Sequence, residues 1–135
     1  MLNHSFFSIE KVSREETIAL SDPQAPEKFI VEVMIHPGHP VFEGHFPGNP
    51  VIPGVCQVQM VTEILEEIYR KKFRLTEADN IKFLSMINPI ETNKLSIALS
   101  CRHSDEENII VNATASAGDK SYLKLKAQFR PDSFI

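Results

Sequence analysis

One stretch near the start of the chain has one strongly apolar face. Residues 28–35 carry a strongly apolar set at every second position: Phe29, Val31, Val33 and Ile35. A period of two places these side chains on one face of a β-strand, so a strand is predicted over 28–35. Residues 6–20 are ambiguous, because their first part also alternates while Ser13-Arg14-Glu15-Glu16 resembles a helix start. We favour a strand with a polar interruption there, followed by a turn or loop over 21–26.

A helical spacing replaces the alternation after residue 54. Apolar side chains recur every three or four positions: Val55, Val58, Val61, Ile64, Leu65 and Ile68. This periodicity predicts a helix over 54–72. Its first half has few charges and should be largely buried. The cations near its end, Arg70, Lys71 and Lys72, suit the negative end of the helix dipole.

Four further strands are predicted after the helix, over 81–87, 93–103, 107–117 and 120–130. One long buried helix combined with five or six strands, most of which follow it in the sequence, predicts an α+β fold. The 135 residues suit a single domain, 1–135, with room for one hydrophobic core.

Composition and charge argue against several classes of protein. A formal net charge of −4 is unfavourable for bulk binding of nucleic acid. No apolar run approaches the length of a membrane span, and the first residues lack a basic region followed by an apolar one, so a cytoplasmic location is expected. His36 and His39 have no further ligands at a recognisable spacing, so no metal site is expected. Cys56 and Cys101 are expected to be small buried side chains.

The loop before the helix is rich in glycine and proline and contains a single histidine, His45. Proline presets φ and glycine permits turns that other residues cannot make, so this composition fixes a loop into one path. The last residues before Val55 have no side chain able to cap the helix: Val51, Ile52, Pro53 and Gly54. The first backbone N–H groups of the helix therefore need another partner, either water or an oxygen atom of a ligand.

Residues 44–55 resemble the signature of the 3-hydroxyacyl-[acyl-carrier-protein] dehydratases of the FabZ/FabA type. They read Gly44-His45-Phe46-Pro47-Gly48-Asn49-Pro50-Val51-Ile52-Pro53-Gly54-Val55. The resemblance implies a hotdog fold, in which a curved antiparallel sheet wraps around one long central helix. It also implies a homodimer, or a larger oligomer of dimers, that acts on an acyl thioester carried by an acyl-carrier protein without a metal or redox cofactor.

The resemblance assigns roles to residues of the loop and of the helix start. His45 is expected to be the base that removes the proton next to the thioester carbonyl, since an imidazole with an unperturbed pKa of about 6.5 titrates near neutral pH. The amides near Gly54 and Val55 are expected to bind the carbonyl oxygen and to stabilise the charge that develops on it. Contacts with the substrate are expected from Phe46, Pro53, Gly54 and Val55.

The chain departs from the family at the position of the catalytic acid. The family's Glu or Asp lies on the central helix of the opposite protomer, fourteen positions after the histidine, and this position holds Gln59. A carboxamide can hold a 3-hydroxyl group by hydrogen bonds but cannot supply a proton at neutral pH. Glu63, one turn further on, is the first choice for a substitute acid, and Glu43 and His39 also lie near His45 in sequence. Alternatively, Gln59 is only the buried end of a polar stripe on the helix.

Three functions remain open. The leading one is removal of water from a 3-hydroxyacyl chain on a carrier protein, with His45 as the base, the Gly54 and Val55 amides on the carbonyl and Gln59 orienting the hydroxyl. The second is thioester hydrolysis, with Gln59 or Glu63 positioning a water molecule. The third is a non-catalytic acyl-binding subunit that pairs with a second hotdog chain, which would supply the missing carboxylate.

Cations and apolar residues alternate over 120–130. A period of two would place four cations on one face: Lys120, Lys124, Lys126 and Arg130. One interpretation is a solvated sheet face whose lysines discourage pairing with other strands. In an otherwise acidic protein, the same face could help to dock an acidic acyl-carrier protein.

Overall fold

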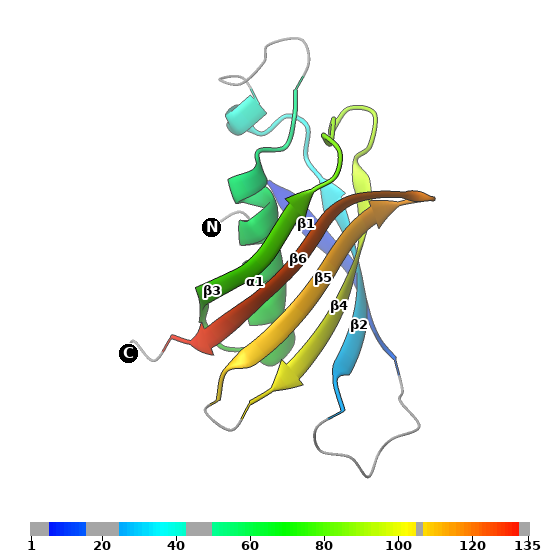
Figure 1. Ribbon diagram of the computed structural model, residues 1–135. Coiled ribbons are helices and arrows are strands. Elements are labelled where there is room, and N and C mark those ends of the chain that lie inside the picture. The colour runs from blue at the N-terminus through cyan, green and yellow to red at the C-terminus, as the bar shows by residue number, and fades with distance from the viewer. Residues whose placement is uncertain (1–5, 16–24, 43–49, 105–106, 133–135) are drawn as a thin grey trace.

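The computed structural model describes residues 6–15, 25–42, 50–104 and 107–132. These residues form β1 (Phe7–Glu15), β2 (Glu27–Ile35), the short 3-10 helix η1 (Pro40–Phe42), α1 (Gly54–Tyr69), β3 (Phe73–Phe83), β4 (Lys94–His103), β5 (Ile109–Ala117) and β6 (Lys120–Pro131). The strands make one sheet in the order β1-β2-β4-β5-β6-β3, and each neighbouring pair is antiparallel. Figure 1 shows the sheet curving around α1, which lies against its inner face.

The hydrophobic core lies between α1 and the inner face of the sheet. Alternate residues of the central strands are buried, and in β2 they are the four predicted from the sequence: Phe29, Val31, Val33 and Ile35. The helix contributes Met60, Val61, Ile64 and Leu65. Because α1 covers only one face of the sheet, the strands keep short polar and charged side chains on the other face. The α+β prediction is confirmed, and the arrangement is that of a hotdog fold.

Most of the predicted strands are confirmed to within two residues: those over 28–35, 93–103, 107–117 and 120–130. The favoured strand near the start also exists as β1, with a bulge between Ile9 and Lys11 where Glu10 interrupts the pairing with β2. Residues 16–24, which include most of the predicted turn, lie outside the described residues. No helix in the described part of the chain is long and apolar enough to cross a membrane.

Two boundaries predicted from the sequence are wrong. The helix ends at Tyr69 rather than at residue 72, because Arg70 adopts a left-handed backbone conformation with φ 56° and ψ 41°. The next strand covers 73–83 rather than 81–87. It is an edge strand in which only Phe73 is buried, so it lacks the apolar alternation that marks a half-buried strand.

The alternation along β6 is interrupted near its start. The pairing register of β5 and β6 shifts between Ala115 and Ser116, and as a result Tyr122 and Leu123 are both buried. Lys120 therefore does not continue the exposed set of Lys124, Lys126 and Arg130, and its Nζ instead lies 5.4 Å from the centre of the Tyr122 ring. The prediction of four cations in one alternating series is corrected to three.

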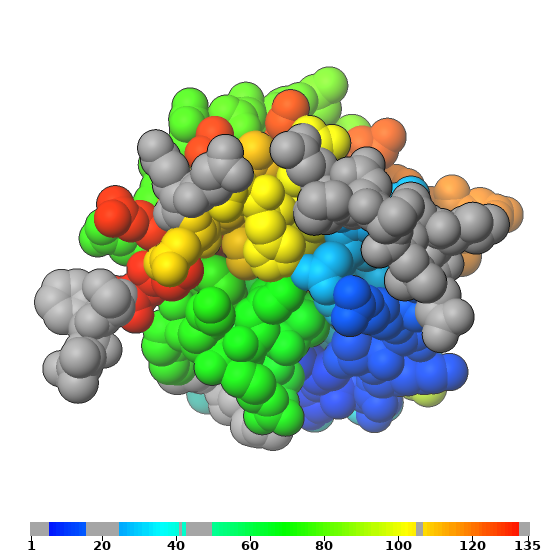
Figure 2. All heavy atoms as spheres, turned by 90° about the horizontal axis from the view of Figure 1, so that it is seen from below, coloured from blue at the N-terminus to red at the C-terminus, as the bar shows by residue number. Residues whose placement is uncertain are grey.

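A hydrogen-bonded cluster joins the end of α1 to three strands. The Tyr69 hydroxyl donates to Glu27 Oε1 at 3.1 Å, His103 Nε2 lies 2.6 Å from the same oxygen, and Arg14 Nη2 lies 2.7 Å from Glu27 Oε2. Burial raises the pKa of Glu27, but the hydrogen bonds from His103 and Tyr69 and the charge of Arg14 outweigh it and leave the pKa below its ordinary value. Figure 2 looks at this end of the molecule, where α1, in green, lies beside β1, in blue.

Replacing Glu27 with Gln should cost stability at neutral pH, by about 1–2 kcal/mol, because the hydrogen bonds to a charged acceptor are lost. The folded pKa of Glu27 lies below its unfolded value near 4.5, so its stabilisation is present above that value and is lost as the pH falls through the folded pKa. Thermal unfolding followed by circular dichroism should show a gap between wild type and Glu27→Gln at neutral pH that closes in acid. A gap that stays constant with pH would contradict the charged role of Glu27.

Candidate active site

Two backbone amides at the start of α1 have no acceptor among the described residues. Pro53 precedes the helix with φ −60° and ψ 145° and has no capping side-chain hydrogen bond, and its carbonyl accepts from the amides of Cys56 and Gln57 at 3.0 and 3.1 Å. In the described part of the chain, the amides of Gly54 and Val55 have no hydrogen-bond partner. They lie at the positive end of the helix dipole, and the side chain of Val55 is exposed, so a ligand can reach them. They can therefore bind an oxygen that carries negative charge.

The connection after β3 holds this helix start in place. The amide of Ile52 donates to the carbonyl of Ile87 at 2.9 Å. The ring of Phe83 lies directly against Gly54, where a Cβ atom would be 2.7 Å from Phe83 Cζ. A larger residue at this position would force the Phe83 ring to move, a close approach that the sequence analysis did not foresee.

Gln57 is a second residue that the sequence analysis missed. Its side chain is buried in the first turn of α1, and its Nε2 donates to the carbonyl of Ile52 at 3.2 Å. No partner for its Oε1 is found among the described residues. A signal was present in the sequence, because Gln57 occupies a position that the spacing of Val61 and Ile64 assigns to the apolar face of the helix. Its hydrogen bond to the carbonyl of Ile52 fixes the loop that leads into the helix.

Gln59 and Glu63 are in direct contact on the helix. Gln59 Nε2 donates to Glu63 Oε2 at 3.1 Å. Glu63 is only 3% exposed, whereas Gln59 is an exposed residue. Within the single chain, the segments around α1 bury the carboxyl and not the amide, and the alternative that makes Gln59 the buried end of a polar stripe stays a prediction for the dimer. Val55, Gln59 and Glu63 follow one another at intervals of four residues, so all three lie along one face of α1.

Two of the predicted site residues, His45 and Phe46, lie outside the described residues, as does Glu43. The site described here thus consists of Pro53, the two amides, and the pair of Gln59 and Glu63. The described residues include no group of three or more His, Cys, Asp or Glu side chains placed to hold a metal ion. Cys101 is buried as predicted, while Cys56 is only half-buried, and burial raises the pKa of both thiols, that of Cys101 to about 11.

Comparison with known proteins identifies the family. The sequence profile of the ApeI-like dehydratases, described as ApeI dehydratase, matches residues 21–124. The chain belongs to the ApeI-like dehydratase family. It is also similar to 3-hydroxyacyl-[acyl-carrier-protein] dehydratases FabZ, with 30% identity over 98 residues to the protein of Oenococcus oeni and 30% over 113 residues to that of Wolbachia pipientis. These matches cover 67% and 71% of this chain, and 62% and 78% of the relatives.

The chain spans less than two thirds of the length of several FabZ relatives, 46% in the case of the protein from Alkaliphilus metalliredigens, which is 34% identical over 68 residues. Solved structures with the same fold include the dehydratase heterocomplex ApeI:P from Xenorhabdus doucetiae, with 18% identity, a TM-score of 0.65 and coverage of 90% of this chain and 96% of that one. A putative thioesterase from Lactococcus lactis has 6% identity and a TM-score of 0.64, and covers 97% of both chains. These likenesses confirm the hotdog fold.

Replacing Gln59 with Glu tests the contact with Glu63. The substitution removes the N–H donor and places a second carboxyl beside the first, and two like charges at this distance repel each other. The variant should therefore be less stable than wild type in mildly alkaline solution, by about 0.5–1.5 kcal/mol, and should recover as the pH falls and one carboxyl becomes protonated.

Gln59→Ala is the control for this prediction, because it removes the donor without adding a charge and so lacks the repulsion that grows as the pH rises. Thermal unfolding of the three proteins at several pH values gives the comparison. If the Glu variant and the Ala variant depend on pH in the same way, Gln59 does not lie against Glu63.

Proposed function

We propose that this chain removes water from a 3-hydroxyacyl thioester carried by an acyl-carrier protein. The observation that carries the proposal is the buried carboxyl of Glu63, held by Gln59 on the helix face that begins at the unpartnered amides. A dehydration of this kind needs an acid, a base and a site for the carbonyl oxygen. Membership of a dehydratase family supports the reaction class, and Glu63 supplies a carboxyl although residue 59 does not.

The first half of the reaction removes a proton from C2 of the substrate. The thioester oxygen accepts hydrogen bonds from the amides of Gly54 and Val55, which stabilise the negative charge that develops on it. We assign the base to His45, in accordance with the resemblance of residues 44–55 to the dehydratase signature. Electrons from the broken C2–H bond move toward the carbonyl, and the proton moves to the imidazole.

The second half expels the 3-hydroxyl group. A protonated Glu63 donates its proton to the hydroxyl oxygen, the C3–O bond breaks, and water leaves as the C2–C3 double bond forms. In this account Gln59 positions the carboxyl of Glu63 rather than the substrate hydroxyl. Because a positioned acid contributes about 10²–10⁴-fold to a rate, this carboxyl would restore much of what a Gln at residue 59 would otherwise cost.

A dimer would complete the site, and features of the surface near the helix start support one. β3 is an edge strand of the sheet, and no other strand of the described residues pairs with its outer side. Beside it lie large apolar side chains with high exposure: Val55 is 77% exposed, Phe83 50% and Met86 78%. A partner protomer that pairs along β3 would cover these side chains and the exposed Gln59. The cytoplasmic location expected from the sequence stays a prediction.

Two other functions are supported by single observations. A thioesterase would use the same amides and would employ Glu63 to activate water, and the putative thioesterase from Lactococcus lactis has the same fold. A non-catalytic subunit paired with a second hotdog chain is supported by Gln59 at the position of the family's acid. The similar structure from Xenorhabdus doucetiae is itself a dehydratase heterocomplex. Dehydration is preferred because Glu63 gives this chain its own acid.

Incubation with a 3-hydroxyacyl thioester separates the three functions by their products. Dehydration forms the enoyl thioester, detected by mass spectrometry, and releases no free thiol. Glu63→Gln should slow this reaction by about 10²-fold or more, since the amide cannot donate the proton.

The exposed residue Glu67, one turn beyond Glu63 toward the end of α1, provides the matched control, and Glu67→Gln should keep the wild-type rate. Release of thiol without enoyl product would show a thioesterase, and neither product would show a binding subunit. If Glu63→Gln forms the enoyl product at the wild-type rate, Glu63 is not the acid.

A further inference from the structure

Five cations line the outer faces of β3 and β6, on the side of the sheet away from α1. Arg74 pairs directly with Arg130, and Lys82 pairs directly with Lys124, while Lys126 lies between these two pairs. All five residues are exposed. We call this set, Arg74, Lys82, Lys124, Lys126 and Arg130, the basic band.

The fold alone does not account for the basic band. Like charges directly opposite each other on neighbouring strands destabilise a sheet, and the band contains two such pairs. The ion pairs of the described chain involve other cations: Arg14, Arg70, Lys72 and His103. Two carboxylates lie on β3 within the band, Glu77 and Asp79, and Glu77 already accepts a hydrogen bond from Gln128 at 3.2 Å. The band is thus a local excess of positive charge in a protein whose net charge is −4.

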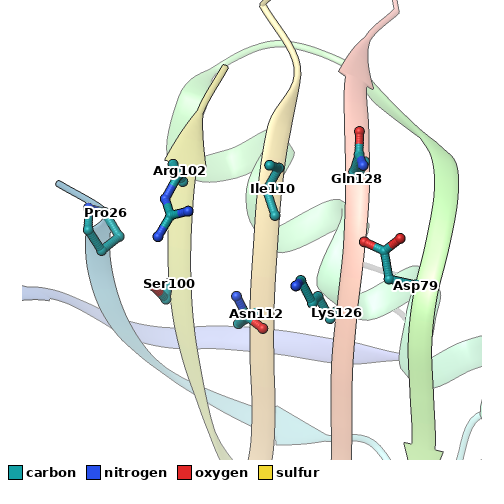
Figure 3. A pocket seen from close by; sticks show the side chains of 8 residues that line it. All are labelled: Pro26, Asp79, Ser100, Arg102, Ile110, Asn112, Lys126 and Gln128. Atoms are coloured by element: carbon teal, nitrogen blue, oxygen red, sulfur yellow. The ribbon is translucent and has the colours of Figure 1, made fainter. Parts of the chain in front are cut away.

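A hollow beside the band extends this positive surface toward β4. It measures about 240 Å³ and is lined by Arg102 and Lys126 together with polar side chains such as Ser100 and Asn112. Figure 3 shows Arg102 on β4 and Lys126 on β6 on either side of Asn112 on β5, with Asp79 pointing toward β6. The hollow therefore offers two cations and several uncharged donors to an acidic group, next to one carboxylate.

The position of the band connects it to the candidate active site. Lys82 and Lys124 form its end nearest the helix start, and the next residue of β3 is Phe83, whose ring lies against Gly54. A partner that lies on the band therefore ends at the edge of the sheet whose inner side faces the start of α1. An acyl chain attached to that partner by a flexible arm would reach the site from this edge of the sheet.

We propose that the basic band is the docking surface for the acidic carrier protein that delivers the acyl thioester, an inference that rests on the proposed function. Its separated cations, interrupted by Glu77 and Asp79, suit individual carboxylates on a folded partner better than a continuous row of phosphates. Electrostatic complementarity of this kind gives speed and specificity to the encounter.

Binding of a fluorescein-labelled acyl-carrier protein, measured by anisotropy at several salt concentrations, tests the proposal without requiring turnover. The double variant Lys82→Glu with Lys124→Glu should weaken binding by about tenfold or more and reduce its dependence on salt. Lys28→Glu with Lys94→Glu is the control, because it makes the same change of charge on the outer face of β2 and β4 and should bind as wild type does.

Lys82→Gln with Lys124→Gln removes the charges without reversing them and should give an intermediate loss, which guards against misfolding of the first variant. Turnover of a small-molecule 3-hydroxyacyl thioester should be unchanged in all of these variants. If wild type binds the carrier through the band but forms no enoyl product, docking stands and the proposed reaction fails.

Equal carrier binding by wild type and both Lys82–Lys124 variants would overturn the proposal. It would also be overturned if these variants lost only the binding to vesicles of anionic lipid. A change in oligomer size by light scattering with no change in carrier affinity would show instead that the band is a contact between copies of this chain.

Discussion

The packing of α1 against the inner face of the sheet is the constraint on which the rest of the structure depends. A sheet with one apolar face needs a cover, and in the described residues α1 provides it with Met60, Val61, Ile64 and Leu65. Both ends of the helix are fixed to the sheet or its connections. The start is held by the bond from Ile52 to Ile87 and by the ring of Phe83, and the end by the cluster around Glu27. These contacts therefore fix the orientation of the helix face that carries Val55, Gln59 and Glu63.

The sequence predicts those features that depend on local spacing. Alternation in 28–35 predicts β2 because the helix covers only one face of that strand, whereas β3 escapes prediction because Phe73 is its only buried residue. Helical spacing predicts that Gln59 and Glu63 share a face, but which of them is buried depends on segments distant in the sequence. The close approach of Phe83 to Gly54 likewise depends on segments distant in the sequence, so local spacing does not predict it. The roles of His45 and Phe46 still rest on resemblance, since both lie outside the described residues.

A Gln at residue 59 need not remove the acid from this site, because the carboxyl of Glu63 lies within hydrogen-bond distance of it. The pair keeps an amide and a carboxyl on the helix face below the two amides, with the carboxyl one turn further along the helix than the family's acid. A substrate that reaches Glu63 must therefore enter deeper along α1 than one that reaches residue 59. The outer face of the sheet, which takes no part in this chemistry, is left to carry the positive charge of the basic band.

The resemblance implies that the base and the acid of one site come from opposite protomers, and we propose that these are His45 of one protomer and Glu63 of the other; co-expression of two inactive variants tests this proposal. In a mixed dimer of His45→Ala and Glu63→Gln chains, one site carries both substitutions and the other carries neither. The account predicts that each variant alone is inactive and that the random mixture recovers about a quarter of the wild-type rate, because half of its dimers contain one intact site of two. If mixed dimers form and no activity returns, the two residues do not act across the interface and the account is wrong.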